Sequence, residues 1–352
     1  MEKFFFIMLF VAMASVAHAQ ELSVCKYWGD RQAAVSLTYD DGLLEHKTLV
    51  ATELEKRGLR GTFWIIGNMV GQRNTDQGDR LTWDEIREME KRGHEMASHS
   101  WSHPNCRKVD YETFMYDVWR NDSAFMQNLG HKSLTFAYPY NSKTDQVVAA
   151  VEEGRIGSRT FQTGHGQQNN KTTLPKMTAW MHELIAKGEW GVTMSHAINK
   201  GYDKWHNPQE LWQFYDTLSA YSPKVWTATF AQVLSYIKER DAVQLKQDVS
   251  GVGTDEWRMV VTPSCTLDPQ IFTQPLTLKV TGAGQNIKAV QYGKTLVCYG
   301  ERNERLIDFN PFGGPITLTY TKILNIIGDS YVQNHRRPKE ETWHYKMAQQ
   351  LG

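Results

Sequence analysis

The chain is poor in cysteine, in net charge and in long apolar runs. It has only four cysteines, at positions 25, 106, 265 and 298, and they are spaced too widely for a zinc knuckle. Cys265 and Cys298 lie in one short β-rich region and could pair, although four cysteines allow three connectivities. The 39 Lys and Arg residues balance 39 Asp and Glu residues. A net charge of zero argues against nucleic acid or an anionic membrane as a partner.

An apolar run stands at the amino terminus, in "MEKFFFIMLFVAMASVAHAQ". Lys3 precedes it, and Ala17-His18-Ala19 forms a small-x-small cleavage site. The run is too short to cross a bilayer. The cleavage site also lacks the cysteine that would indicate a lipid anchor. We therefore expect residues 1–19 to be a cleavable signal peptide. The mature chain is expected to be secreted or periplasmic, without a membrane span.

Segments typical of strands and helices alternate from about residue 30 to 240. The strand candidates are "AAVSLTYDD", "GTFWIIG", "HEMASHS", "LTFAYPY", "IGSRTF", "WGVTMSHA" and "VWTATF". One intervening helix is expected to begin with a capping box made by Thr82 and Glu85. About seven βα units in one block predict a parallel sheet closed into an α/β barrel over residues 20–245.

The pattern changes after Arg240. Residues 250–322 contain "RMVVTPSC", "PLTLKVTG", "IKAVQYG" and "ITLTYTK", separated by Gly, Pro and Asn turns. Short strands without a long helix predict a small β-sandwich domain. Residues 323–352 change again, to an apolar strand, a Gly-Asp-Ser turn and a helix-like end, and predict an incomplete α/β fragment.

Chemically capable polar residues follow several of the barrel strands. They are Asp40, Asp41, His99, His103, Tyr140 and His196. Barrel enzymes place their working residues at the carboxyl ends of strands, and a random scatter of polar residues would not keep choosing that end.

Each of these motifs alone has an ordinary structural explanation, because Asp-Asp-Gly is a common turn and neutral histidines often bond to backbone. His99 and His103 are four residues apart, so on one helical turn they would share a face, as metal-binding histidine pairs do. Together with one of the two aspartates they would form a His₂Asp metal site with open positions, and the other aspartate would be a spare carboxylate. That arrangement is typical of metal-assisted hydrolysis.

The segments "LTYDDG", "HSWSH", "FAYPY" and "TMSHAI", in this order, resemble the motifs of the polysaccharide deacetylase family, the NodB-homology carbohydrate esterases of family 4. The resemblance covers roughly residues 30–240. It implies a distorted (β/α)7 barrel and one divalent metal, commonly zinc, with cobalt as an alternative. It also implies that Asp41, His99 and His103 bind this metal.

The same resemblance implies three catalytic roles. Asp40 would be the general base. The backbone N–H of Tyr140 would help to stabilise the oxyanion, which gains negative charge and needs a fixed donor. His196 would be the general acid, since an imidazole can protonate a departing alkoxide or amine near neutral pH.

Two positions depart from the family pattern. The third family motif carries an arginine that orients and charge-pairs with the base, but Ala137 stands there in this chain. Another cation, such as Arg159, would have to replace it. The family also often has an acidic residue that supports the acid histidine, yet residues 154–182 contain no Asp or Glu.

The tail "IIGDSYVQN" resembles the opening block of an SGNH (GDSL) hydrolase, in which Ser330 would be the nucleophile. Such an enzyme also needs an oxyanion Gly and Asn and an Asp/His pair far downstream, but the sequence ends at Gly352. A serine without a base is not activated. Either residues 323–352 are the truncated start of such a domain in a longer two-enzyme protein, which we favour, or the match arises by chance; in both cases we expect no serine esterase activity.

The sequence thus predicts a secreted, metal-dependent deacetylase acting on an acetylated polysaccharide or oligosaccharide. The barrel motifs do not distinguish O-acetyl from N-acetyl groups. Because SGNH esterases commonly remove O-acetyl groups, the tail favours acetylated plant polysaccharide, as for an acetylxylan esterase. N-acetyl groups on chitin or peptidoglycan are the alternative, and so is a non-catalytic carbohydrate-binding barrel. The role of the β-sandwich and the oligomeric state stay open.

Overall fold

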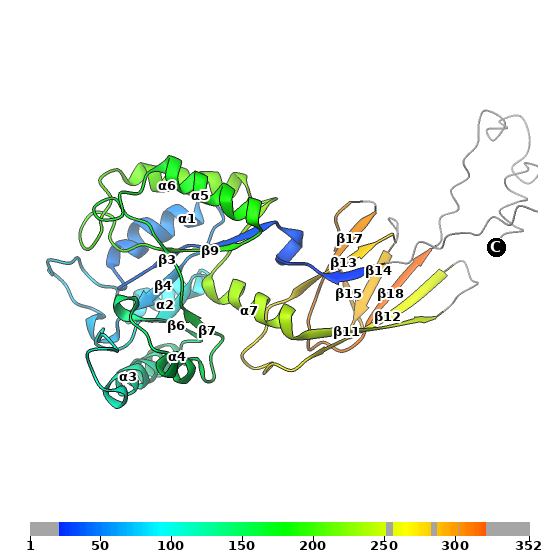
Figure 1. The fold of residues 1–352 in the computed structure, drawn as a ribbon, viewed down its shortest axis with the longest axis horizontal. Coiled ribbons are helices and arrows are strands. Elements are labelled where there is room, and N and C mark those ends of the chain that lie inside the picture. Colours follow the sequence, from blue (N-terminus) through cyan, green and yellow to red (C-terminus); the bar gives the residue numbers. More distant parts are fainter. Residues whose placement is uncertain (1–20, 251–255, 283–286, 302, 322–352) are drawn as a thin grey trace, which may run out of the picture.

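The computed structural model describes residues 21–250, 256–282, 287–301 and 303–321, which form two units placed end to end (Figure 1). The expected signal peptide (1–19) and the SGNH-like tail (323–352) lie outside the described residues. No helix in the described part of the chain is long and apolar enough to cross a membrane.

The larger unit contains short parallel strands surrounded by helices (Figure 1). One sheet contains, in order, β10 (Val225–Thr227), β2 (Ala33–Ser36), β9 (Trp190–Met194) and β8 (Thr163–Gly164). The other contains, in order, β3 (Thr38–Tyr39), β4 (Thr62–Ile65), β5 (Glu95–Ser98), β6 (Thr135–Ala137) and β7 (Gly157–Arg159).

The two sheets join into one curved surface. Strands β2 and β3 are successive parts of one segment, and Tyr39 of β3 also bridges to Ser195, directly after β9. Among the described residues no ladder joins β7 to β8, so the barrel is not closed by hydrogen bonds. The structure therefore confirms the predicted α/β barrel and its distortion.

Helices cover the outside of this barrel (Figure 1). They are α1 (Thr52–Glu55), α2 (Trp83–Lys91), α3 (Tyr111–Leu129), α4 (Asp145–Glu152), α5 (Leu174–Lys187), α6 (Pro208–Ala220) and α7 (Phe230–Ala242). The predicted capping box of α2 is present, since the Thr82 side chain accepts from the Glu85 N–H and the Glu85 carboxylate accepts from the Thr82 N–H. Strands β2 and β4 are buried along their whole length, as expected for parallel strands that are covered on both faces.

The smaller unit is a β-sandwich of two antiparallel sheets. One contains β1 (Leu22–Val24), β13 (Leu276–Thr281), β17 (Glu304–Phe309) and β16 (Cys298–Tyr299). The other contains β11 (Val243–Ser250), β12 (Glu256–Cys265), β18 (Ile316–Thr321), β14 (Ile287–Gln291) and β15 (Lys294–Leu296). Buried apolar side chains from both sheets share one core, for example Leu278, Ile307 and Leu318.

The boundary between the two units differs from the expected one. Strand β1 pairs with β13, so the described chain begins in the sandwich, and β11 already starts at Val243. This pairing joins segments about 250 residues apart and leaves no local sequence signal. The possible pairing of Cys265 and Cys298 is not formed: all four thiols are free, and these two lie in different sheets.

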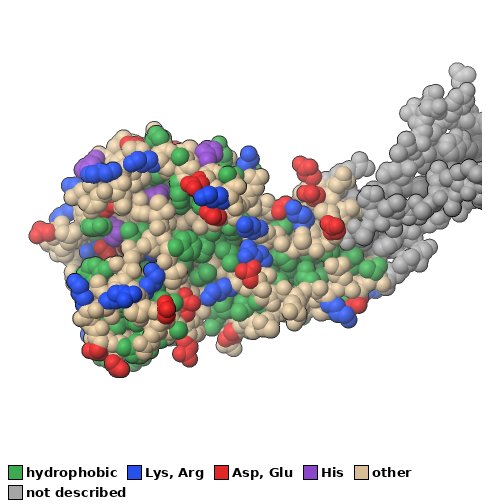
Figure 2. Space-filling view, in the orientation of Figure 1, with side chains coloured by type: hydrophobic (Ala, Val, Ile, Leu, Met, Phe, Trp, Pro, Cys, Tyr) green, Lys and Arg blue, Asp and Glu red, His purple; other side chains and the backbone are tan. Residues whose placement is uncertain are grey.

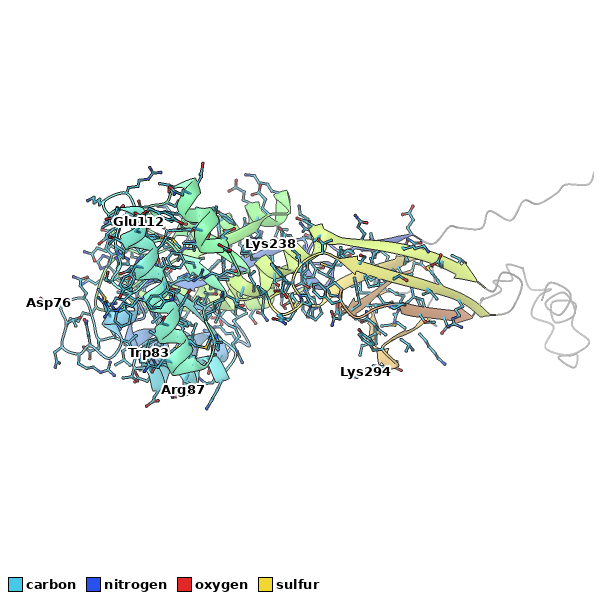
Figure 3. All side chains as sticks on the ribbon, turned by 90° about the horizontal axis from the view of Figure 1, so that it is seen from below. Asp76, Trp83, Arg87, Glu112, Lys238 and Lys294 are labelled. Atoms are coloured by element: carbon cyan, nitrogen blue, oxygen red, sulfur yellow. The ribbon has the colours of Figure 1, made fainter. Side chains whose placement is uncertain are left out.

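The sandwich adjoins the amino-terminal ends of the barrel strands. The chain passes from β1 through a short 3₁₀ turn, Trp28–Asp30, into the start of β2. The Tyr236 hydroxyl on α7 donates to the Cys25 carbonyl at 2.9 Å, and Figure 3 places Lys238 of α7 near the junction. The carboxyl ends of the strands therefore face away from the sandwich. On the face shown in Figure 2, basic and acidic side chains are interspersed, in keeping with the zero net charge.

Candidate active site

The structure brings together all six predicted site residues at the carboxyl ends of the barrel strands. Asp40 and Asp41 follow β3, His99 and His103 follow β5, Tyr140 follows β6, and His196 follows β9. Parallel strands present their carboxyl ends at one edge, which explains why motifs spread over more than 150 residues converge there.

Asp41, His99 and His103 form a compact set of potential metal ligands. One ligand atom from each lies within 4.8 Å of the others. The Asp41 Oδ1 atom is 3.8 Å from His99 Nε2 and 3.9 Å from His103 Nε2, and the two Nε2 atoms are 3.2 Å apart. Asp41 Oδ1 is buried and has no hydrogen-bond partner among the described residues. An unpaired buried carboxylate oxygen facing two imidazole nitrogens is a site that fits a divalent cation.

The orientation of His99 supports the same reading. Its Nδ1 lies 2.8 Å from the Ala137 carbonyl, which can only accept, so Nδ1 carries the proton and Nε2 presents a lone pair to the site. Burial lowers the pKa of His99 to about 4. The imidazole is therefore neutral at physiological pH, as a metal ligand must be.

The two histidines lie on a loop, and the expected helical turn is absent. Ser100 and His103 both have positive φ, 65° and 60°. The buried carboxylate of Asp117 on α3 accepts from the N–H groups of Trp101 and Ser102, at 2.8 and 3.0 Å. The Ser100 hydroxyl accepts from the His103 N–H at 3.1 Å. This tertiary anchoring overrides local helix propensity, and Asp117 is a site-supporting residue that the sequence did not reveal.

Asp40 is held by Arg159, the last residue of β7. Arg159 Nη1 donates to Asp40 Oδ1 at 2.6 Å and Nη2 donates to Oδ2 at 2.5 Å, and each residue is only 2% exposed. Burial alone would raise the pKa of Asp40, but the charge and hydrogen bonds of the Arg159 guanidinium hold it well below its usual range. The carboxylate is therefore ionised and fixed in orientation.

Arg159 lies beside the position where the family motif has its arginine. Ala137 and Arg159 are paired residues in the parallel ladder between β6 and β7. Neighbouring positions on paired strands share a face of the sheet, so an arginine at either position can point at the same carboxylate. The structure thus confirms the expectation that another cation, Arg159, takes the place left by Ala137.

His196 lies on the other side of Asp40, with its Nε2 3.9 Å from Asp40 Oδ2. The ring of Tyr202 packs against it in a T-shaped arrangement, with ring centroids 4.8 Å apart. Tyr140 has a positive φ of 58°, and its ring is 65% exposed and lies 4.6 Å from the His103 ring. Among the described residues the Tyr140 N–H has no hydrogen-bond partner, whereas the N–H groups of the next two residues bond to backbone carbonyls.

The turn that carries both aspartates is also supported by Arg80, which sequence reasoning missed. Asp41 and Gly42 have positive φ, 79° and 63°. Arg80 Nη1 donates to the Asp41 carbonyl at 3.1 Å, and the Leu81 N–H donates to the Gly42 carbonyl at 2.9 Å. These contacts stabilise the positive φ of Asp41, which a non-glycine residue rarely adopts. They join positions about 40 residues apart, and no local motif indicates them.

Comparison with known proteins gives one family. The polysaccharide deacetylase family matches residues 29–156. The peptidoglycan-N-acetylglucosamine deacetylase PgdA of Listeria monocytogenes is 27% identical over 118 residues, covering 33% of this chain and 23% of that protein. Chitin deacetylase 1 of Cryptococcus neoformans has the same identity and coverage. The structure of peptidoglycan deacetylase PdaC from Bacillus subtilis aligns with a TM-score of 0.44 and 17% identity, over 60% of this chain and 94% of that one.

Residues 29–156 therefore match a polysaccharide deacetylase domain of the NodB-homology type, carbohydrate esterase family 4. The family match includes Asp40, Asp41, His99, His103 and Tyr140. The match covers 23% of the length of PgdA and of chitin deacetylase 1, and 42% of the length of the Bacillus cereus peptidoglycan-N-acetylglucosamine deacetylase.

Proposed function

We propose that this protein is a secreted, metal-dependent hydrolase that removes acetyl groups from a polysaccharide. The observation that carries the proposal is the convergence of Asp41, His99 and His103 beside a carboxylate that Arg159 keeps ionised. A divalent metal held by these three residues would activate a water and polarise the acetyl carbonyl. Two imidazoles and one carboxylate with open positions suit zinc, and cobalt suits the same ligands.

The residues around this site supply the proton transfers. Asp40 is positioned to accept a proton from the attacking water, because its ion pair with Arg159 keeps the carboxylate in the ionised form. The free N–H of Tyr140 donates to the carbonyl oxygen as it gains negative charge. His196 donates a proton to the departing sugar oxygen or nitrogen as the carbon–oxygen or carbon–nitrogen bond breaks. The products are acetate and the free hydroxyl or amine.

The substrate that we favour is an O-acetylated polysaccharide such as acetylated xylan. Its support is the resemblance of the tail "IIGDSYVQN" to SGNH esterases, since two esterase-like segments in one chain suit a shared substrate. An N-acetylated glycan is the second candidate, because the curated relatives are named for deacetylation of peptidoglycan N-acetylglucosamine and of chitin. Two departures from the family pattern favoured a non-catalytic, carbohydrate-binding barrel: the missing arginine at position 137 and the missing acidic residue. The first no longer counts for it, because Arg159 pairs with Asp40 from the adjacent strand.

The test is acetate release by metal-stripped protein before and after the addition of zinc or cobalt. Acetylated xylan and N-acetylated chito-oligosaccharides are compared side by side, with Asp40→Asn as the matched inactive variant. Metal-restored release from xylan alone supports the O-acetyl esterase. Release from the chito-oligosaccharide alone keeps the mechanism and replaces the substrate. No release from either, or an Asp40→Asn variant as active as wild type, refutes the proposed function.

A further inference from the structure

A buried histidine outside the family motifs connects the two halves of the site. His46 has no exposed surface. Its Nδ1 lies 3.2 Å from the Leu43 N, and its Nε2 lies 2.9 Å from the His196 carbonyl oxygen. A backbone N–H only donates and a carbonyl only accepts, so Nδ1 is unprotonated and Nε2 carries the hydrogen. One neutral imidazole therefore bridges the turn after Asp40 and the main chain of His196.

The preceding residue, Glu45, binds the loop that follows His196. The Glu45 carboxylate accepts from the N–H groups of Ile198 and Asn199, the latter at 3.0 Å. These hydrogen bonds are charge-assisted and join segments about 150 residues apart. Glu45 and His46, which we call the Glu-His clamp, thus hold the His196 carbonyl and the N–H groups of Ile198 and Asn199.

The clamp acts where the strand ladder ends. Within the barrel, the Asp40 N–H donates to the Ser195 carbonyl at 2.8 Å and the Ser195 N–H donates to the Thr38 carbonyl at 3.0 Å. Beyond Ser195 no such ladder is present among the described residues, and His196 carries its ring on a loop. Contacts to the main chain at His196 therefore help to fix where that ring lies relative to Asp40, together with the packing of Tyr202.

The local structure at the clamp is itself unusual. Residues His46–Ala51 form a π-helical turn that leads into α1. Such turns are rare and frequently occur at functional sites, because the extra residue per turn re-aims side chains. Here the wide turn begins at His46, directly after Glu45, and both side chains reach the loop that follows β9.

We propose that Glu45 and His46 are positioning residues that hold His196 in place to protonate the leaving group. This inference rests on the proposed deacetylase function and goes beyond it, because it assigns a role to residues outside the metal site and the family motifs. We expect that loss of the clamp impairs leaving-group protonation more than the earlier steps, because the turn after Asp40 keeps its contacts to Arg80 and Leu81.

The experiment compares two acetyl donors with different leaving groups. An acetylated sugar needs a proton on its departing oxygen, whereas 4-nitrophenyl acetate releases a stable phenolate without one. General-acid catalysis is worth about 10²–10⁴-fold, so we expect His46→Phe to lower kcat on the acetylated glycan by about 10–100-fold. We expect less than about a threefold change on 4-nitrophenyl acetate, with KM and bound zinc unchanged. His46→Gln, which keeps an acceptor and a donor, should recover part of the glycan activity.

His94 provides a matched control at the other end of the barrel. It is buried, its Nδ1 accepts from the Gly61 N–H at 3.1 Å, and its Nε2 lies 2.8 Å from Glu55. His94→Phe removes the same kind of bridge far from the site, so it should lower thermal stability without changing the ratio of the two activities.

An unchanged ratio of the two activities in His46→Phe would overturn the clamp, whether both activities stay at the wild-type level or fall in parallel. Should His46→Phe fail to fold, the ratio of the two activities is measured in Glu45→Gln. This variant keeps the side-chain volume and weakens the hydrogen bonds to the N–H groups of residues 198 and 199. Wild-type protein that hydrolyses neither substrate would refute the proposed function itself, and this proposal with it.

Discussion

Replacing Arg159 with alanine is expected to damage both the base and the fold. The Asp40 carboxylate would lose two donors, at 2.6 and 2.5 Å, and would stay buried without its cation. Removing one partner of a buried ion pair costs about 3–5 kcal/mol, so we expect a free energy of unfolding lower by about 3 kcal/mol. An unpaired Asp40 binds a proton more readily and loses its orientation. General-base catalysis is worth about 10²–10⁴-fold, so acetate release should fall by about 10²-fold or more.

The assay combines urea unfolding of metal-free protein, followed by tryptophan fluorescence, with acetate release by the zinc-loaded protein. Arg155→Ala is the matched control, because the buried Arg155 forms an ion pair with the half-buried Asp122 away from the site. It should lower stability and leave acetate release unchanged. The double variant Ala137→Arg, Arg159→Ala should regain activity, since the two positions are paired neighbours. An Arg159→Ala protein as active and as stable as wild type would refute the reasoning.

Three further results are expected. His103→Ala should fold, by circular dichroism, yet lose its stoichiometric metal on dialysis; one retained equivalent of zinc would contradict the ligand assignment. Asp117→Ala frees the N–H groups of the histidine loop, so zinc affinity in a competition titration should fall about 10–100-fold, whereas unchanged affinity would deny Asp117 this role. Burial raises the pKa of Glu95, so the wild-type stability falls as pH rises through that raised value. Glu95→Gln mimics the protonated form, so its stability relative to wild type, measured by urea unfolding, should improve as the pH rises above the ordinary pKa of a glutamate; a difference that does not change with pH would contradict the raised pKa.

Much of the barrel could be predicted because its signals are local. Parallel strands covered on both faces appear as apolar runs, and the Thr82–Glu85 capping box is visible as a four-residue pattern. The convergence of Asp40, His99 and His196 follows from the common direction of the strands that precede them.

The contacts that were missed are those between distant segments. Strand β1 joins the sandwich through β13, and nothing near residue 22 indicates that partner. The histidine pair lies on a loop because Asp117, from the next helix, binds its backbone. His46 reads as one more residue of a helix in "LLEHKTLVATEL", since its two hydrogen-bond partners are visible only in three dimensions.

The exchange of arginine between Ala137 and Arg159 bears on how relatives of this chain should be sorted. A survey that scores the third motif letter by letter counts Ala137 as decay and marks the chain as a pseudoenzyme. The ladder between β6 and β7 shows that the same guanidinium can be supplied from the adjacent strand. Whether the carboxylate at position 40 keeps its cation is therefore better judged from both strands, β6 and β7, than from the loss of one motif position.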